Sequence, residues 1–149
     1  MNSKRLNVLC DIDHTLSNSF WRDEMIGGPG GWDEYHANAA ADEPLPDMVN
    51  MINSLSDTGY NIVAITARPE KWRKMTMDWL VRYGIFTDEL LMRADTDYHP
   101  APEIKLKLAN ERFKDIKDEV AFVLDDRVDV VAAFKALGVT ALQVHGRRV

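Results

Sequence analysis

The feature that most constrains this chain is the sequence DIDHT at positions 11–15, which directly follows an apolar stretch at residues 6–10. The apolar stretch predicts a buried strand, and the side chains of Asp11 and Asp13, two residues apart, then leave it on the same face. Two carboxylates this close raise each other's pKa, and a divalent cation with oxygen ligands relieves the repulsion. The run therefore predicts an α/β protein with a metal site at the carboxyl end of its first strand. A solvated acidic turn is the alternative.

Two later apolar runs also end in polar clusters. Residues 61–65 lead into Thr66, and residues 120–124 lead into the sequence DDR at positions 125–127. Because the carboxyl ends of parallel strands lie at one edge of a sheet, these clusters should meet the first one. Lys105 lies between them, in a segment with a helical pattern. The arrangement favours one functional site over three unrelated turns.

Strand and helix patterns alternate along the chain. Short apolar runs predict strands at residues 5–10, 61–65, 89–92, 120–124 and 140–144. Apolar residues at helical spacing predict helices at residues 46–57, 70–83, 102–113 and 128–137. Such alternation is typical of parallel βαβ units. The sequence therefore predicts a doubly wound, Rossmann-like α/β fold with a five-stranded parallel sheet.

The ordered polar residues resemble a known superfamily. The four motifs of the haloacid dehalogenase superfamily of phosphotransferases are similar, in content and order, to Asp11-x-Asp13-x-Thr15, Thr66, Lys105 and Asp125-Asp126. The resemblance implies phosphoryl transfer with Mg²⁺ as cofactor. It implies metal contacts from Asp11, Asp13, Asp125 and Asp126. Since Mg²⁺ uses only one or two carboxylates and keeps waters, one of the adjacent pair at 125–126 is expected to bind directly; the sequence leaves open which.

Four candidates divide the chemistry of phosphoryl transfer. Asp11 is the predicted nucleophile, since a carboxylate can attack phosphorus and give an aspartyl-phosphate. Asp13 is the predicted acid and base, which protonates the leaving alkoxide and then takes a proton from the hydrolytic water. Thr66 is predicted to donate its hydroxyl to a phosphoryl oxygen. Lys105 is predicted to neutralise charge on the phosphoryl group and on Asp11.

Four arginines support a narrower resemblance within the superfamily. They are Arg22, Arg68, Arg93 and Arg127, and the last three lie in T-x-R, M-R-x-x-x-D and D-D-R stretches. These stretches and the overall length are similar to the 3′-phosphatase domain of phage polynucleotide kinase-phosphatases. Because arginine forks bind phosphate, the resemblance implies substrate contacts from all four. Residues 97–103 depart from the family's acidic-basic run before its lysine, so the loop that contacts nucleic acid is expected to differ there.

Residues 17–44 are the predicted small cap insertion after the first strand. The segment holds the sequence GGPGG at positions 27–31 and shows no strand pattern. It is too short for a separate lid domain, so the site is expected to stay open, which favours a large or polymeric substrate. Its aromatic residues, Trp21, Trp32 and Tyr35, either stack on a nucleobase or pack on the sheet.

Composition predicts one globular domain over residues 1–149. Of the 149 residues, 46% are hydrophobic and 28% are charged. No apolar stretch approaches the roughly 20 residues that span a membrane, and no signal-peptide pattern precedes the first strand. The single cysteine, Cys10, fits a reducing compartment, so a cytoplasmic location is expected. The net charge of −6 argues against a large non-specific nucleic acid surface but allows a short basic groove.

The leading prediction is a Mg²⁺-dependent phosphomonoesterase that removes a 3′-phosphate from nucleic acid ends through an aspartyl-phosphate intermediate. The main alternative is a 5′(3′)-deoxyribonucleotidase or another small-molecule phosphatase, because such enzymes resemble the chain in the same motifs. A non-catalytic interaction module is a third possibility, against which the intact Asp11, Asp13, Lys105 and Asp125 argue. No G-x-x-x-x-G-K-[ST] run occurs, so 5′-kinase activity is expected from a separate polypeptide. A homodimer, and the choice between DNA, RNA and mononucleotides, stay open.

Overall fold

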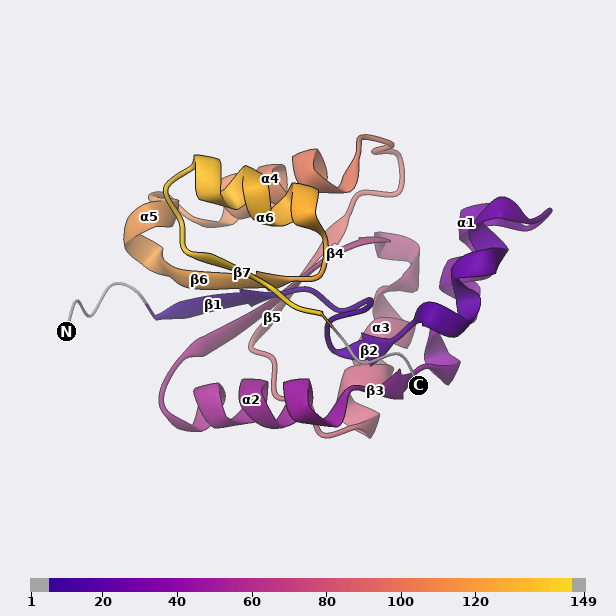
Figure 1. Cartoon of the computed structure of the whole chain (residues 1–149), viewed down its shortest axis with the longest axis horizontal. Helices are drawn as coiled ribbons and strands as arrows, with labels where there is room; N and C mark the ends of the chain where they lie inside the picture. Colours follow the sequence, from indigo (N-terminus) through magenta and orange to yellow (C-terminus); the bar gives the residue numbers. More distant parts are fainter. Residues whose placement is uncertain (1–5, 146–149) are drawn as a thin grey trace.

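Five parallel strands form the central sheet of the protein. The structure is a computed structural model that describes residues 6–145 (Figure 1). The strand order is β5-β4-β1-β6-β7, and every neighbouring pair is parallel. The bounds are Asn7–Cys10 for β1, Asn61–Pro69 for β4, Glu89–Arg93 for β5, Val120–Asp125 for β6 and Ala141–Gln143 for β7. The predicted doubly wound sheet is confirmed; residue 5, where the first predicted strand begins, lies outside the described residues.

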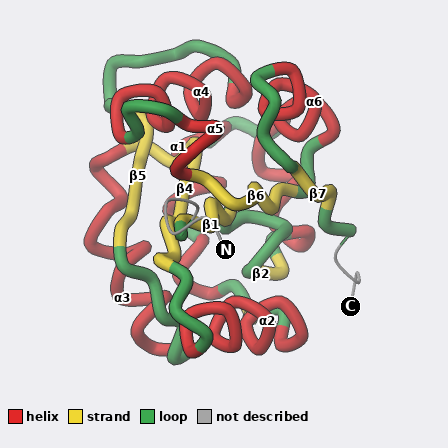
Figure 2. Tube along the Cα trace, turned by 90° about the vertical axis from the view of Figure 1, so that its left-hand side faces the viewer, coloured by secondary structure: helices red, strands yellow, loops and turns green. Residues whose placement is uncertain are grey.

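Helices cover both faces of this sheet (Figures 1 and 2). One face carries α4 (Ala101–Arg112), α5 (Ile116–Glu119) and α6 (Val128–Ala136), and the other carries α2 (Pro46–Asp57) and α3 (Arg73–Arg82). The helix predicted at residues 46–57 has those bounds. The helix predicted at residues 70–83 begins instead with a 3₁₀ turn, η3 (Glu70–Trp72). None of the helices in residues 6–145 combines the length and apolar character that a bilayer crossing requires.

Strand β1 lies at the centre of the sheet and contributes to both cores. Leu9 packs in one cluster with Phe134 of α6, whereas Val8 and Cys10 pack in the other with Trp79 of α3. Burial raises the pKa of the Cys10 thiol, so this group stays neutral and packs as a small apolar side chain. Because β1 is held between β4 and β6, the residues that follow it start from a rigid base.

The segment between β1 and α2 lies beyond the carboxyl end of β1 (Figure 1). It consists of β2 (Ser17–Asn18), η1 (Phe20–Gly27), α1 (Gly31–Ala37), η2 (Ala39–Ala41) and β3 (Glu43–Pro44). Although the sequence of this segment shows no strand pattern, β2 and β3 pair antiparallel within it. Two residues per strand are too few to leave an alternating pattern in the sequence. Within the segment Tyr35 is buried, whereas Trp32 is 56% exposed.

Candidate active site

A cavity of about 850 Å³ opens at the carboxyl ends of β1, β4 and β6. These three ends lie side by side because the chain passes from β1 to β4 on one side and later returns to β6 on the other. Such a switch in strand order is where ligands bind in open α/β sheets. Asp11, Lys105 and Asp126 line the cavity, so the residues that directly follow β1 and β6 do meet a residue of α4 there.

Lys105 joins two of these strand ends. Its Nζ donates to Oδ1 of Asp11 at 2.8 Å and to Oδ2 of Asp125 at 2.5 Å, and all three side chains are at most 6% exposed. Although burial opposes its charge, the two carboxylates hold the pKa of Lys105 above its ordinary value. The hydroxyl of Thr15 donates to Oδ2 of Asp11 at 3.1 Å. Both oxygens of the predicted nucleophile are therefore oriented, one of them by a cation.

Three carboxylates gather beside Lys105. Asp11, Asp125 and Asp126 each offer an oxygen, and these oxygens lie within 4.8 Å of one another. Burial raises the pKa of each group from 3.8 to about 6, and repulsion from neighbouring carboxylates adds to the rise. An oxygen-only set with more negative charge than one lysine can balance fits a hard divalent cation such as Mg²⁺. Among the described residues this group does not include the Asp13 side chain, whose predicted metal contact stays a prediction.

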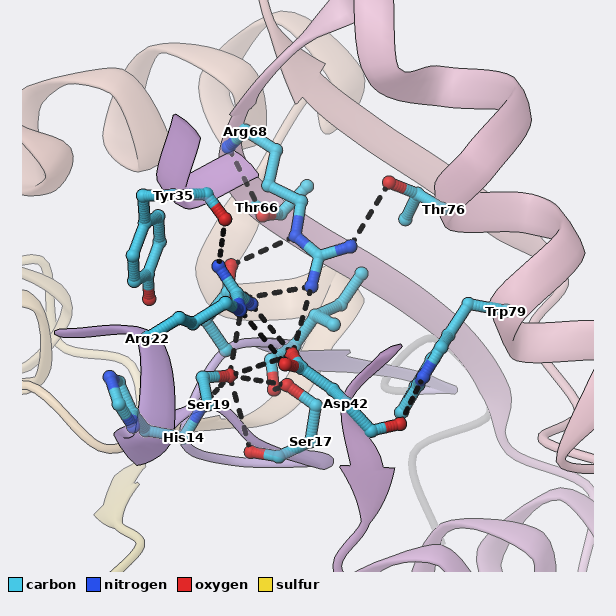
Figure 3. Close-up of polar contacts among 12 residues, drawn as sticks. His14, Ser17, Ser19, Arg22, Tyr35, Asp42, Thr66, Arg68, Thr76 and Trp79 are labelled. Atoms are coloured by element: carbon cyan, nitrogen blue, oxygen red, sulfur yellow. Dashed lines mark hydrogen bonds and ion pairs between the residues drawn. The ribbon is translucent and has the colours of Figure 1, made fainter. Parts of the chain in front are cut away.

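Two arginines hold Asp13. Arg68 donates from Nε to Oδ2 at 2.9 Å and from Nη2 to Oδ1 at 2.8 Å, and Arg22 donates from Nη2 to Oδ1. The two guanidinium groups converge from η1 and β4 (Figure 3). Although burial opposes its charge, Arg68 and then Arg22 hold the pKa of Asp13 well below its usual range. The predicted acid-base residue is therefore ionised in this arrangement.

Arg22 is fully buried and lies behind the cavity wall. Its Nε and Nη2 donate to the two carboxylate oxygens of Asp42 at 2.8 and 2.6 Å, and its Nη1 donates to the Tyr35 carbonyl at 2.9 Å. The guanidinium carbon lies 4.0 Å from the centre of the Tyr35 ring. Because each nitrogen has a protein partner, the predicted contact between Arg22 and substrate has no support in this geometry. Arg22 instead positions Asp13.

Asp42 is the member of this network that the sequence analysis did not select. It is fully buried in the turn before β3 and accepts from Ser19 Oγ at 3.1 Å (Figure 3). It also accepts from Trp21 Nε1 at 2.9 Å. Its backbone carbonyl accepts from Nε1 of Trp79 at 2.9 Å, which ties it to α3. Asp42 therefore connects the cap segment to the body of the protein.

The four charges of the network balance one another. Arg22 and Arg68 are cations, Asp13 and Asp42 are anions, and each side chain except that of Asp13 is at most 1% exposed. Buried charges are tolerated when they are paired and hydrogen-bonded. No motif spacing in the sequence marks Asp42, 20 residues after Arg22; its role follows only from the burial of Arg22, which needs anionic partners.

The loop after β1 makes a tight turn. His14 adopts a φ of 62°, in the left-handed region that favours glycine. The carbonyl of Ile12 accepts from the backbone N–H groups of Thr15, Leu16 and Ser17 at 2.9 to 3.1 Å. This turn reverses the chain directly after the two acids and leaves His14 on the cavity lining.

Thr66 lies near the site without lining the cavity. Its Oγ1 accepts from the backbone N–H of Arg68 at 3.1 Å, and its side chain is buried. The hydroxyl proton is left for another acceptor. The predicted bond from Thr66 to a phosphoryl oxygen stays a prediction.

The remaining two arginines line the cavity but already have partners. Arg93 donates from Nε to the Ala67 carbonyl at 2.7 Å and from Nη1 to two carbonyls of the 94–100 loop at 2.8 and 2.7 Å. Arg127 pairs through Nε and Nη2 with the carboxylate of Asp129 at 2.9 and 2.7 Å. Arg93 therefore shapes the loop before α4, and substrate contacts from either arginine stay predictions.

A family model of the polynucleotide kinase PNKP phosphatase domain matches residues 6–147. This chain belongs to that family. The membership confirms the resemblance to haloacid dehalogenase superfamily phosphatases that the ordered motifs predicted, and this phosphatase domain is accordingly a phosphomonoester hydrolase. A search among curated proteins found no match to the chain.

Solved structures are similar to this phosphatase domain over nearly its whole length. A chain of the Pnkp1/Rnl/Hen1 complex is 28% identical with a TM-score of 0.79, and the match covers 97% of this chain and 48% of that one. A chain of the Pnkp1/Rnl/Hen1 RNA repair complex is 29% identical with the same TM-score, at 97% and 44% coverage. This chain therefore spans about half the length of those relatives.

More distant structures share the fold. The class C acid phosphatase from Bacillus anthracis is 18% identical with a TM-score of 0.69, covering 99% of this chain and 69% of that one. A hydrolase from Streptococcus pneumoniae TIGR4 is 14% identical with a TM-score of 0.61, covering 96% and 94%. At this identity the likeness concerns architecture alone.

Proposed function

We propose that this phosphatase domain removes a 3′-phosphate from the end of a nucleic acid strand, with Asp11 as the nucleophile and Mg²⁺ in the carboxylate cluster. The observation that carries the proposal is the buried contact of Lys105 with Asp11 at 2.8 Å, beside a large cavity, in a member of the PNKP phosphatase family. An oriented carboxylate beside a fixed cation suits attack on a phosphoryl group. The RNA repair complex of the 29% identical relative supports a nucleic acid substrate.

In the first step a carboxylate oxygen of Asp11 forms a bond to phosphorus as the bond between phosphorus and the ester oxygen breaks. The electron pair leaves with that oxygen, which takes a proton from Asp13. Lys105 and Thr15 hold the attacking carboxylate in position. Asp11, Asp125 and Asp126 would hold the Mg²⁺, which would supply positive charge to offset that of the phosphoryl group.

In the second step a water molecule attacks phosphorus and gives a proton to Asp13. The bond between phosphorus and Asp11 breaks, which restores the carboxylate and releases inorganic phosphate. Asp13 ends the cycle protonated, as it began, so the balance of protons closes.

The protonated form of Asp13 needs an explanation, because two arginines favour its ionised form. Arg68 lines the cavity, whereas Arg22 does not. Although Arg68 is 1% exposed and its nitrogens are bonded to Asp13 and Thr76, we infer that a substrate phosphate in the cavity competes with Asp13 for its fork. Loss of that partner, together with the incoming negative charge, raises the pKa of Asp13 when substrate binds.

A phosphate-release panel with Mg²⁺ tests the proposal. The substrates are a 3′-phosphorylated oligonucleotide, the matching 5′-phosphorylated one, 3′- and 5′-mononucleotides and an aryl phosphate. We expect the highest kcat/KM for the 3′-phosphorylated oligonucleotide and none of this activity in Asp11→Asn, which controls for contaminating phosphatases. Equal or better mononucleotide hydrolysis would make the chain a nucleotidase. No release from any substrate would favour the interaction module.

We also infer that this phosphatase domain prepares strand ends for a ligase. Removal of a 3′-phosphate leaves a 3′-hydroxyl, the group on which a strand-sealing ligase acts. The occurrence of similar chains in Pnkp1/Rnl/Hen1 complexes supports a role next to such a ligase. In a coupled assay, a nicked substrate with a 3′-phosphate and a 5′-phosphate should be sealed by a ligase only after incubation with this phosphatase domain.

A further inference from the structure

The cavity is larger than a phosphoryl group requires. Pockets of about 300–1,000 Å³ commonly enclose whole small-molecule ligands, and this one measures about 850 Å³. The residues of the proposed chemistry, Asp11, Asp13 and Lys105, account for one part of its lining. The rest is formed by α1, by the end of β4 with η3, and by the loop before α4. This second part faces whatever the phosphate is attached to.

Helix α1 presents aromatic rings to the cavity. Trp32, Tyr35 and His36 are spaced i, i+3 and i+4, so they share one face of the helix, and all three line the cavity. The Trp32 ring stacks on His36 at 5.7 Å with an interplanar angle of 25° and meets Tyr35 edge-on at 5.4 Å. Tyr35 is itself fixed under the Arg22 guanidinium. The indole is therefore held from behind, yet 56% of Trp32 is exposed.

His36 adds a polar group to this wall. It is 7% exposed, and its Nδ1 has no hydrogen-bond partner within the described residues 6–145. Burial lowers the pKa of His36 to about 4, so the ring is neutral at physiological pH. A neutral ring can stack closely on the indole without bringing a charge into this wall of the cavity.

A second exposed ring lies on a neighbouring segment. Tyr98, in the loop before α4, lines the cavity and is 88% exposed. Lys71 connects the two segments, because its Nζ donates to Asp33 of α1 at 2.7 Å and its backbone N–H donates to Asp95 at 2.8 Å. Trp32 and Tyr98 therefore lie on the two segments that Lys71 connects.

The charges around the cavity give little general attraction for a phosphate backbone. Five lysine and arginine side chains and six aspartates line it. Among the cations, Lys71 pairs with Asp33 and Arg127 pairs with Asp129. Recognition of the substrate beyond its scissile phosphate therefore has to come from uncharged contacts, and aromatic rings are what this part of the cavity offers.

We propose that Trp32, with His36 behind it and Tyr98 on the adjoining segment, forms a subsite that binds the nucleobase of the terminal nucleotide by stacking. A nucleobase matches the site because its flat faces suit stacking on the two exposed rings, while His36 supports the Trp32 ring from behind. The inference rests on the proposed function, in which that base is one sugar away from the phosphorus atom.

The test compares two 3′-phosphorylated oligonucleotides that differ only in whether the terminal nucleotide carries a base, together with a small alkyl phosphate without rings. Trp32→Ala should raise KM for the base-containing oligonucleotide at least about fivefold. It should leave KM for the abasic oligonucleotide and the alkyl phosphate within about twofold. Trp32→Phe should restore most of the preference. Phe86→Ala, which removes another exposed ring away from the cavity, should change none of these values.

Measuring oligonucleotide binding in a variant without turnover provides an independent test. In an Asp11→Asn background, fluorescence anisotropy of the labelled oligonucleotides should show the same base-dependent loss for Trp32→Ala and for Tyr98→Ala. The Tyr98 side chain is almost fully exposed, so this second variant tests the subsite even if Trp32→Ala fails to fold. Equal effects on base-containing and abasic strands, or no effect on either, would overturn the subsite. Failure of the wild type to release any oligonucleotide 3′-phosphate would instead overturn the proposed function.

Discussion

Arg68 holds Asp13 at two points, with Nε 2.9 Å from one carboxylate oxygen and Nη2 2.8 Å from the other. A planar fork of this kind fixes the orientation of a carboxylate as well as its charge. Acid-base catalysis depends on that orientation, because the proton must reach the leaving oxygen over one hydrogen-bond length. In this phosphatase domain an arginine that was predicted to bind substrate therefore also orients the proposed acid-base residue.

Substitutions at this pair should depend on the leaving group. Asp13→Asn should lower kcat for a 3′-phosphorylated oligonucleotide by about 10²–10⁴-fold, and by less for an aryl phosphate, whose leaving group needs little protonation. Arg68→Lys keeps the positive charge but loses the fork. It should also lower kcat more for the oligonucleotide than for the aryl phosphate, by smaller factors than Asp13→Asn does. Steady-state kinetics on both substrates measure the effect. Equal losses of Asp13→Asn on the two substrates would count against the acid role.

The charge balance around Asp42 predicts a large effect on stability. Asp42→Asn keeps the shape of the side chain but leaves the buried Arg22 short of an anionic partner, so the free energy of unfolding should fall by about 3–5 kcal/mol. Denaturant unfolding measures it. Asp33→Asn is the matched control, since Asp33 pairs with Lys71 at the surface and should change stability by at most about 1 kcal/mol. A similar small loss for both variants would contradict the structural role of Asp42.

The carboxylate cluster predicts how metal and pH act together. Asp11, Asp125 and Asp126 have pKa values raised from 3.8 to about 6, so the metal-free folded state holds protons that the unfolded state has released. The stability that this protonation contributes is present below pH 3.8 and is lost as pH rises through about 6. The proposed Mg²⁺ would bind the deprotonated cluster, so the stabilisation it gives should grow over the same window.

Thermal unfolding with Mg²⁺ and with chelator, at pH 5 and at pH 7.5, measures this coupling. The difference in Tm should be larger at pH 7.5, and Asp126→Asn should reduce it. Phosphate release should disappear in chelator while circular dichroism still shows the folded protein, since the cluster lies at the edge of a complete sheet. Full activity in excess chelator would exclude the metal from the reaction.

Asp11→Asn should abolish phosphate release with the fold intact. An amide cannot attack phosphorus, and loss of a nucleophile commonly lowers kcat by more than about 10³-fold. Asp57→Asn, on the exposed side of α2, is the control for removal of one acidic charge and should keep full activity. If Asp11→Asn retained a tenth of the wild-type rate with Mg²⁺ present, another residue would have to be the nucleophile.

The sheet was predictable because its strands are short apolar runs, each followed by a turn or a polar cluster. The helix at residues 46–57 was predictable to the residue, since a proline at its start and apolar residues at helical spacing define it. The cap segment was not. Its strands β2 and β3 have two residues each, and the segment takes its structure from long-range contacts such as that of Trp21 with Asp42.

The site was predictable where the order of motifs constrains it and not where charges pair across the chain. Asp11, Lys105 and Asp125 meet because each follows or faces a central strand. The sequence analysis assigned Arg22 to substrate because the family resemblance and the phosphate-binding geometry of arginine imply such a contact, and the sequence does not show that Arg22 is buried. Its burial follows from Asp42, a single aspartate among 24 acidic residues that no spacing distinguishes.

The pairing of Arg22 with Asp42 also decides how this domain can be redesigned. A single replacement at either position leaves a buried charge without its partner. Exchanging both for apolar residues of similar volume removes the ion pair as a unit. Such a double variant would leave Asp13 with Arg68 as its one remaining arginine. The pair could therefore be exchanged as one unit, which would change the pKa of Asp13, the proposed acid, without altering any residue that lines the cavity.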